Sequence, residues 1–153
     1  MSKLKTITTI KRIANRLKKE KKRIVFTNGC FDLLHPGHIK LLRDAKKNGN
    51  ILIVGLNSDS SIKKIKGKKR PIMPQGSRAE VLSALELVDY VVIFTEKTPY
   101  NLIKEIKPHV LVKGSDWGEN QIIGSELVKK IVRVKLFGGY STTKIIEKIT
   151  KNE

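Results

Sequence analysis

The chain has 153 residues, enough for one domain with a proper hydrophobic core but not for two large ones. Hydrophobic residues make up 39% of it, which is typical of a globular protein and argues against disorder. No apolar run approaches the ~20 residues of a membrane span, and the N-terminus lacks the continuous apolar segment of a signal peptide. The single cysteine cannot form an internal disulfide, so we expect a cytoplasmic protein with no membrane partner.

The formal net charge of +18 suggests nucleic-acid binding as one hypothesis. However, residues 1–23 alone hold ten lysines or arginines and one glutamate, so this segment carries half of the net positive charge. The few aromatic residues are not interleaved with the basic runs, as stacking on bases would require. We therefore interpret the charge first as a solvated lysine-rich surface and second as a means of steering phosphate-bearing small molecules. A nucleic-acid partner is not expected.

Residues 1–22 are predicted to form an N-terminal amphipathic basic helix, and residues 23–150 the main domain. Within the first segment Ile7, Ile10 and Leu17 recur at helical spacing, with lysine and arginine between them. Such a helix would dock on the core through its apolar face.

The main domain alternates between strand-like and helix-like segments, and most strand-like segments are continuously apolar. The predicted strands are residues 24–28, 51–57, 90–94, 110–114 and 131–137. The predicted helices are residues 36–49, 77–88, 99–106, 124–130 and 142–149, with a basic loop over residues 58–76. This alternation predicts an α/β fold with a single doubly wound parallel sheet and an extra N-terminal helix.

Capping residues support three of these helices. Pro36 suits a first helical turn, and Gly49 suits a C-cap. Ser77 is followed three residues later by Glu80, which predicts a capping box. Ser141 is expected to cap the last helix, and this helix start also suits phosphate.

In a doubly wound sheet the ligand binds outside the carboxyl ends of the strands. Three polar segments end there: TNGCFD after the first strand, NSD after the second and KGSDW after the fourth. We expect the binding residues in these segments.

The first of them continues into FTNGCFDLLHPGH, which holds the only cysteine and two of the three histidines. A cysteine nucleophile with His35 or His38 as its base is one hypothesis, but we interpret Cys30 as a small, partly buried loop residue. A zinc site is another hypothesis, but the spacings between Cys30, His35 and His38 do not match the usual patterns of zinc ligands.

Phosphate binding fits this segment better. Gly29 lets the backbone pass close to a ligand, and His35 and His38 flank Pro36 and Gly37 at the predicted start of a helix. A helix N-terminus presents free N–H groups and a positive dipole end, which favour anions. Imidazoles placed there can donate hydrogen bonds to phosphate oxygens and stabilise the charge that builds up as a phosphoryl bond breaks.

FDLLHPGH carries the HxGH signature of the nucleotidyltransferase superfamily. Over residues 23–150 the order of TNGCFDLLHPGH, VGLNSDSSIKKIKGKKRPIMP, SRAEVLSALELVDYVV, LVKGSDW and GGYSTTKIIEKI more specifically resembles the heptose 1-phosphate adenylyltransferases of ADP-heptose synthesis. The resemblance implies a Rossmann-like nucleotidyltransferase fold and direct transfer of AMP from ATP to a heptose 1-phosphate, with pyrophosphate leaving. It further implies a homodimer and Mg²⁺ held mainly by substrate phosphates and water, without an assigned protein ligand.

The resemblance also implies roles for individual residues. His35 and His38 would stabilise the triphosphate in the transition state, with Arg78 and Lys66 as further catalytic cations. We favour Arg78 because it opens a predicted helix, whereas residues 63–70 hold six lysines or arginines whose directions the sequence does not show. The residues that the resemblance places around the nucleotide are Thr27, Asn28, Gly29, Cys30, Phe31, Asp32, Gly37, Asn57, Asp59, Arg70, Gly114, Asp116, Trp117, Ser141, Thr142 and Thr143.

Two features depart from the family pattern. Many heptose enzymes carry a sugar kinase domain before this one, and residues 1–22 are too short for it, so a stand-alone adenylyltransferase is expected. KGSDW stands where the family often has Gly-Gly-Asp-Tyr, and its Trp117 is similar to that of glycerol-3-phosphate cytidylyltransferases. Cytidylyl transfer to glycerol 3-phosphate or a similar small phosphate is therefore the alternative function. A basic nucleic-acid-binding module is a third hypothesis, outside the nucleotidyltransferases. His109, in a connecting segment, is interpreted as a surface residue rather than a ligand.

Overall fold

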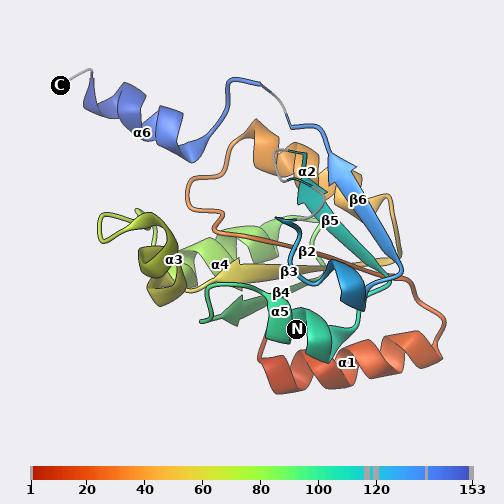
Figure 1. The fold of residues 1–153 in the computed structure, drawn as a ribbon. Coiled ribbons are helices and arrows are strands. Elements are labelled where there is room, and N and C mark those ends of the chain that lie inside the picture. Colours follow the sequence, from red (N-terminus) through yellow and green to blue (C-terminus); the bar gives the residue numbers. More distant parts are fainter. Residues whose placement is uncertain (1, 116–117, 119–120, 137, 152–153) are drawn as a thin grey trace.

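A parallel sheet of six strands lies at the centre of the computed structural model, in the order β1-β4-β3-β2-β5-β6 (Figure 1). The structure describes residues 2–115, 118, 121–136 and 138–151. Every strand pairs in parallel with its neighbours. The strands are β1 (Leu4–Lys5), β2 (Ile24–Gly29), β3 (Ile51–Asn57), β4 (Tyr90–Phe94), β5 (Val110–Gly114) and β6 (Lys130–Val134). The predicted doubly wound α/β fold is confirmed.

Helices cover both faces of this sheet. They are α1 (Ile7–Lys19), α2 (Pro36–Lys46), α3 (Asp59–Lys66), α4 (Gln75–Ala84), α5 (Tyr100–Ile106) and α6 (Thr142–Thr150), with a 3₁₀ turn at Ser125–Leu127. Because side chains alternate along a strand, the sheet contributes to two cores. Val25 and Val112 pack with Leu42 of α2 on one face, whereas Phe26 and Leu111 pack against α1 and α5 on the other.

The N-terminal helix is an integral part of the second core. Thr6 caps α1 by accepting a hydrogen bond from the backbone N–H of Thr9. Ile10, Ala14 and Leu17 are buried, as their helical spacing predicted. Just before this helix, β1 adds an edge strand beside β4 that the sequence analysis did not predict. Two residues are too short to leave a periodic pattern.

Two predictions in the middle of the chain differ from the structure, namely the loop over residues 58–76 and the N-cap at Ser77. Helix α3 lies inside the segment predicted as a basic loop, with Ser58 as its N-cap and Ile62 fully buried. Helix α4 begins at Gln75 after Pro74, so Ser77 lies inside the helix and does not cap it. A proline is a good residue before a helix start, and it moved this boundary two residues ahead of the predicted capping box.

Gly49 was also misassigned. Helix α2 already ends at Lys46, and its C-cap Lys47 has right-handed helical geometry. Gly49 instead lies against the backbone before β2, where an added Cβ would come within 2.6 Å of the carbonyl oxygen of Arg23. The glycine is therefore required by a close backbone approach. Among the residues that the structure describes, none of the helices has both the length and the apolar character needed to cross a bilayer.

The burial of α1 gives a direct test of its structural role. Replacing Ile10 with Ala should lower the free energy of unfolding by about 2–5 kcal/mol, because Ile10 is 0% exposed and leaves a cavity. Ile7 of the same helix is 38% exposed, so Ile7→Ala should change stability by about 0.5 kcal/mol or less. Urea denaturation of both variants measures the difference. Equal losses would show that the helix does not pack as described.

Candidate functional site

A cavity of about 550 Å³ lies at the carboxyl ends of the central strands. Asn28 at the end of β2 and Cys30 in the turn after it form one wall, the end of β5 contributes Gly114, and His38 of α2 also lines the cavity. β2 has β3 on one side and β5 on the other, so the order of the strands reverses between β2 and β5. The crevice at such a reversal is the usual ligand site of an open α/β sheet.

Two histidines form a stacked pair at the start of α2. His35 is the N-cap, and its Nδ1 accepts a hydrogen bond of 3.1 Å from the backbone N–H of Gly37. The rings of His35 and His38 are 3.9 Å apart between centroids and tilted by 27°. Gly37 leaves room for this cap, since an added Cβ would lie 2.9 Å from Cε1 of His35.

Both imidazoles are neutral near pH 7. Burial, together with the neighbouring His35 and Lys66, lowers the pKa of His38 to about 4. Burial also lowers the pKa of His35. Because Nδ1 of His35 acts as an acceptor, the proton of its neutral ring is assigned to Nε2. The pair therefore offers uncharged N–H donors beside a helix N-terminus, where anions are favoured.

Cys30 does not have the environment of a nucleophile. Burial raises the pKa of its thiol, although Lys66, Arg78 and Arg70 act in the opposite direction. The reactive form of cysteine is the thiolate, so a thiol held protonated is inert at neutral pH.

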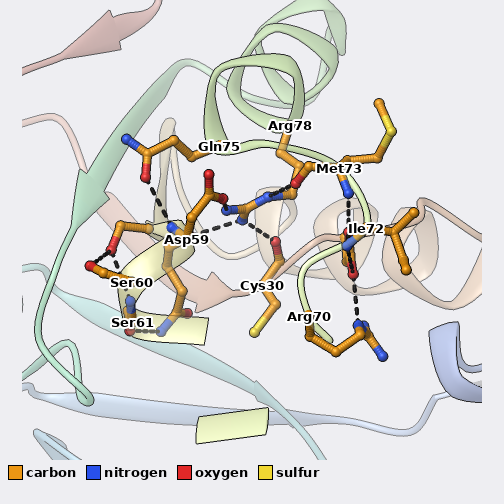
Figure 2. A network of polar contacts seen from close by, with 12 residues as sticks. Cys30, Asp59, Ser60, Ser61, Arg70, Ile72, Met73, Gln75 and Arg78 are labelled. Carbon is orange, nitrogen blue, oxygen red and sulfur yellow. Dashed lines mark hydrogen bonds and ion pairs between the residues drawn. The ribbon is translucent and has the colours of Figure 1, made fainter. Parts of the chain in front are cut away.

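Arg78 is buried and joins four segments of the chain (Figure 2). One of its terminal nitrogens donates to the carbonyl oxygens of Cys30 at 2.6 Å and Asn57 at 2.8 Å. Its Nε donates to the carbonyl oxygen of Met73 at 2.9 Å, and its other terminal nitrogen pairs with Asp59 at 2.7 Å. The guanidinium thus bonds to protein acceptors through all three nitrogens.

A second buried ion pair fixes the loop between α3 and α4. The carboxylate of Asp32 accepts hydrogen bonds from Nε of Arg70 at 2.9 Å and from the backbone N–H groups of Ile72 and Met73. Burial alone would raise the pKa of Asp32, but the hydrogen bonds from Met73, Ile72 and Arg70 outweigh it and lower the pKa. Asp32 and Arg70, both predicted around the nucleotide, are bonded to each other.

The segment before α6 comes close to the histidine pair. Tyr140 stacks over His35 with 6.4 Å between ring centroids. Ser141 caps α6 as predicted, accepting from the backbone N–H of Lys144, and Thr142 donates to the carbonyl oxygen of Leu33. The start of α6 therefore lies beside the start of α2.

A model of the cytidylyltransferase-like family matches residues 26–148. The chain belongs to this family. The resemblance to HxGH nucleotidyltransferases is thereby confirmed. His35 and His38 are the two histidines of the HxGH motif in this chain.

Relatives and solved structures agree with this family. Proteins named bifunctional protein HldE from Aliarcobacter butzleri and Helicobacter pylori (strain J99) are 53% and 50% identical over 99% and 95% of the chain. The chain spans only 32% and 31% of their lengths. The lipopolysaccharide core biosynthesis protein of Thermoplasma volcanium is 32% identical, with a TM-score of 0.67 over 76% of this chain and 98% of that one. A pantoate-beta-alanine ligase from Francisella tularensis (TM-score 0.65, 99% and 78% covered) shares the fold at 17% identity.

The structure brings many of the predicted site residues together around the cavity. Those that line it are Thr27, Asn28, Gly29, Cys30, Phe31, His38, Asn57, Lys66 and Gly114. Thr143 lies exposed at the start of α6. Asp116 and Trp117 lie outside the described residues. His109 is half-buried at the opposite end of β5, and its Nδ1 accepts a hydrogen bond of 3.0 Å from the backbone N–H of Ile24.

Sequence analysis did not predict the polar lining residues Lys97, Thr98, Lys113 and Gln121, nor the apolar ones Leu41, Ile65, Pro99, Ile123 and Leu136. The signal for Lys113 was present, because it is a lysine within an otherwise apolar strand. Lys97 and Thr98 follow β4 at the same edge of the sheet, so their position after a strand could have included them. Among the described residues, no three histidine, cysteine or acidic side chains lie close enough together to hold a metal ion.

The protonation state of His38 can be measured directly. In the folded chain its imidazole should titrate with a midpoint near 4, followed by ¹H–¹⁵N NMR of the ring nitrogens. In urea the midpoint should return to about 6.5. Because the folded pKa is the lower one, acid favours the unfolded state, and stability should fall as the pH drops from about 6.5 toward 4. A folded-state midpoint at 6.5 or above would contradict the described burial.

Removing the Arg78 guanidinium should destabilise the whole region. Arg78→Met leaves three backbone carbonyls and the partly exposed Asp59 without their donor, which should cost about 2–4 kcal/mol. Arg12→Met, at an exposed position of α1, should cost about 0.5 kcal/mol or less and serves as the matched control. Urea unfolding measures both. A similarly small change at Arg78 would mean that its bonds do not hold the region together.

Proposed function

We propose that the chain transfers AMP from ATP to a heptose 1-phosphate, giving ADP-heptose and pyrophosphate. The observation that carries the proposal is the neutral, stacked His35–His38 pair at the N-terminus of α2, of which His38 lines the cavity at the crevice between β2 and β5. The similarity to proteins named HldE and to a lipopolysaccharide core biosynthesis protein supports a sugar phosphate as the acceptor.

The reaction is a single displacement at phosphorus. An oxygen of the sugar phosphate attacks the α-phosphorus of ATP, the bond from that phosphorus to the bridging oxygen breaks, and the electron pair leaves with pyrophosphate. His38 and Nε2–H of His35 donate hydrogen bonds to the phosphate oxygens on which negative charge increases. Lys66, exposed at the mouth of the cavity, supplies a mobile positive charge. No covalent intermediate is needed, in keeping with the protonated thiol of Cys30.

The remaining predicted residues divide into binding and positioning groups. We propose that the backbone from Thr27 to Phe31 lies along the phosphates, and that Gly114, Asp116 and Trp117 hold the base and ribose. The start of α6 would contact the phosphates next to His35. The residues that we assign to positioning, because their polar groups bond to one another, are Asp32, Asp59, Arg70 and Arg78.

Magnesium would enter with the nucleotide. Mg²⁺ usually keeps several waters and binds through substrate phosphates, with few protein ligands. Asp32 and Asp59, the predicted site carboxylates that the structure describes, are already paired with arginines. We therefore propose that the ion is held by the triphosphate and water, where it offsets phosphate charge.

Cytidylyl transfer to a small phosphate is the second candidate. It is favoured by the family description and by the KGSDW segment at the end of β5. Both candidates share the histidine pair and the direction of transfer, and they differ in the base and acceptor that fill the cavity.

A pyrophosphate-release screen tests the proposal. Four nucleoside triphosphates are each combined with heptose 1-phosphate or glycerol 3-phosphate, and release should require ATP together with heptose 1-phosphate. His35→Ala/His38→Ala should lower turnover by about 10³-fold or more, while His109→Gln, at the far end of β5, should retain it.

The outcomes separate the alternatives. Turnover with CTP and glycerol 3-phosphate alone would favour the cytidylyltransferase. Full activity in the folded double variant would overturn the catalytic assignment. Tight, salt-dependent nucleic-acid binding that survives the double change, without turnover of any pair, would favour a nucleic-acid-binding module.

A further inference from the structure

Lys113 is a buried lysine at the end of β5. All five residues of this strand are buried, and Lys113 itself is 8% exposed. Strands in the middle of a parallel sheet are normally apolar throughout, and a buried ammonium is costly because it loses its hydration. Lys113 therefore stands out among the residues of this strand.

The side chain points toward the crevice where the strand order reverses. Since side chains alternate along a strand, Lys113 faces the same side of the sheet as Leu111, and Asn28 of β2 faces the same side as Phe26. Nζ of Lys113 donates to Oδ1 of Asn28 across this crevice. Both residues line the cavity.

This hydrogen bond also orients the amide of Asn28. Its oxygen accepts from the ammonium of Lys113, so its NH₂ group, on the other branch of the planar amide, points away from that ammonium. The ammonium and the NH₂ group are therefore two donors on neighbouring strands, and both belong to residues that line the cavity.

The other cavity lysines differ in their surroundings. Lys66 and Lys97 are exposed at the rim, so their charges are hydrated and their side chains are free to change rotamer. The Lys113 charge is fixed by the strand and shielded from water, and a fixed charge in a dry site stabilises an anion more strongly than a solvated one.

We propose that Lys113 is a substrate-binding residue whose ammonium contacts a phosphoryl oxygen at the floor of the cavity, with Asn28 as its oriented companion. This inference rests on the proposed function, and it adds a cation on the opposite side of the reacting phosphate from the histidine pair. The phosphoryl group belongs either to the triphosphate or to the acceptor, and kinetics distinguish the two.

The test compares Lys113→Met with Lys130→Met, a lysine on the neighbouring strand β6 that is exposed. Lys113→Met should lower kcat/KM by about 100-fold or more, whereas Lys130→Met should stay within about twofold. Calorimetric binding of inorganic pyrophosphate and ATP is measured alongside. Weaker binding of both by about tenfold assigns the contact to the triphosphate, and a raised KM for the acceptor alone assigns it to the acceptor.

Stability separates a binding role from a structural one. Lys113→Met keeps the length of the side chain but leaves the Asn28 oxygen without this donor, so urea denaturation of the variant checks that it remains folded while it loses activity. Lys113→Gln, which removes the charge but can still donate to Asn28, provides a second variant if Met does not fold. Unchanged kinetics and unchanged pyrophosphate binding in a folded variant would overturn the inference. A wild-type chain that binds pyrophosphate but turns over no pair would instead contradict the proposed function alone.

Discussion

The buried guanidinium of Arg78 is the contact on which the arrangement of the site depends. It bonds to the turn after β2 through Cys30, to the end of β3 through Asn57, to α3 through Asp59 and to the following loop through Met73. Buried carbonyl groups need a donor, so these four segments have one low-energy arrangement in which all of them are satisfied. The turn after β2, which lines the cavity, is thus held in place by a buried residue that is not among the lining residues.

Within that frame, charge is distributed unevenly around the cavity. The groups at the start of α2 are uncharged donors, because burial lowers the pKa of both His35 and His38, and the neighbouring His35 and Lys66 lower that of His38 further. Positive charge comes instead from lysines, with Lys66 at the rim and Lys113 at the floor. Neutral donors next to the reacting bond avoid the cost of burying two stacked cations, while the lysines compensate a highly anionic substrate. This division suits a reaction in which negative charge moves from one phosphate oxygen to another.

Periodicity in the sequence was enough to predict the main strands and the amphipathic N-terminal helix. It also predicted that the candidate site lies at the carboxyl ends of the strands. It did not predict α3, because its apolar positions are few and lie within a run of lysines. The roles of Asp32, Arg70 and Arg78 could not be predicted either, since each role depends on a partner about 20 to 50 residues away in the chain. Lys113 was visible as a polar residue in an apolar strand, but only the pairing of β2 with β5 places it opposite Asn28.

The central claim is that nucleotidyl transfer occurs in one direct displacement, without a covalent enzyme intermediate. The stereochemical course at the α-phosphorus tests it most directly. With a single diastereomer of adenosine 5′-O-(1-thiotriphosphate) and heptose 1-phosphate, the configuration at phosphorus of the sugar nucleotide is determined by ³¹P NMR. One in-line displacement predicts inversion. Retention would contradict the account, because it requires two displacements and therefore a nucleotidylated residue on the protein.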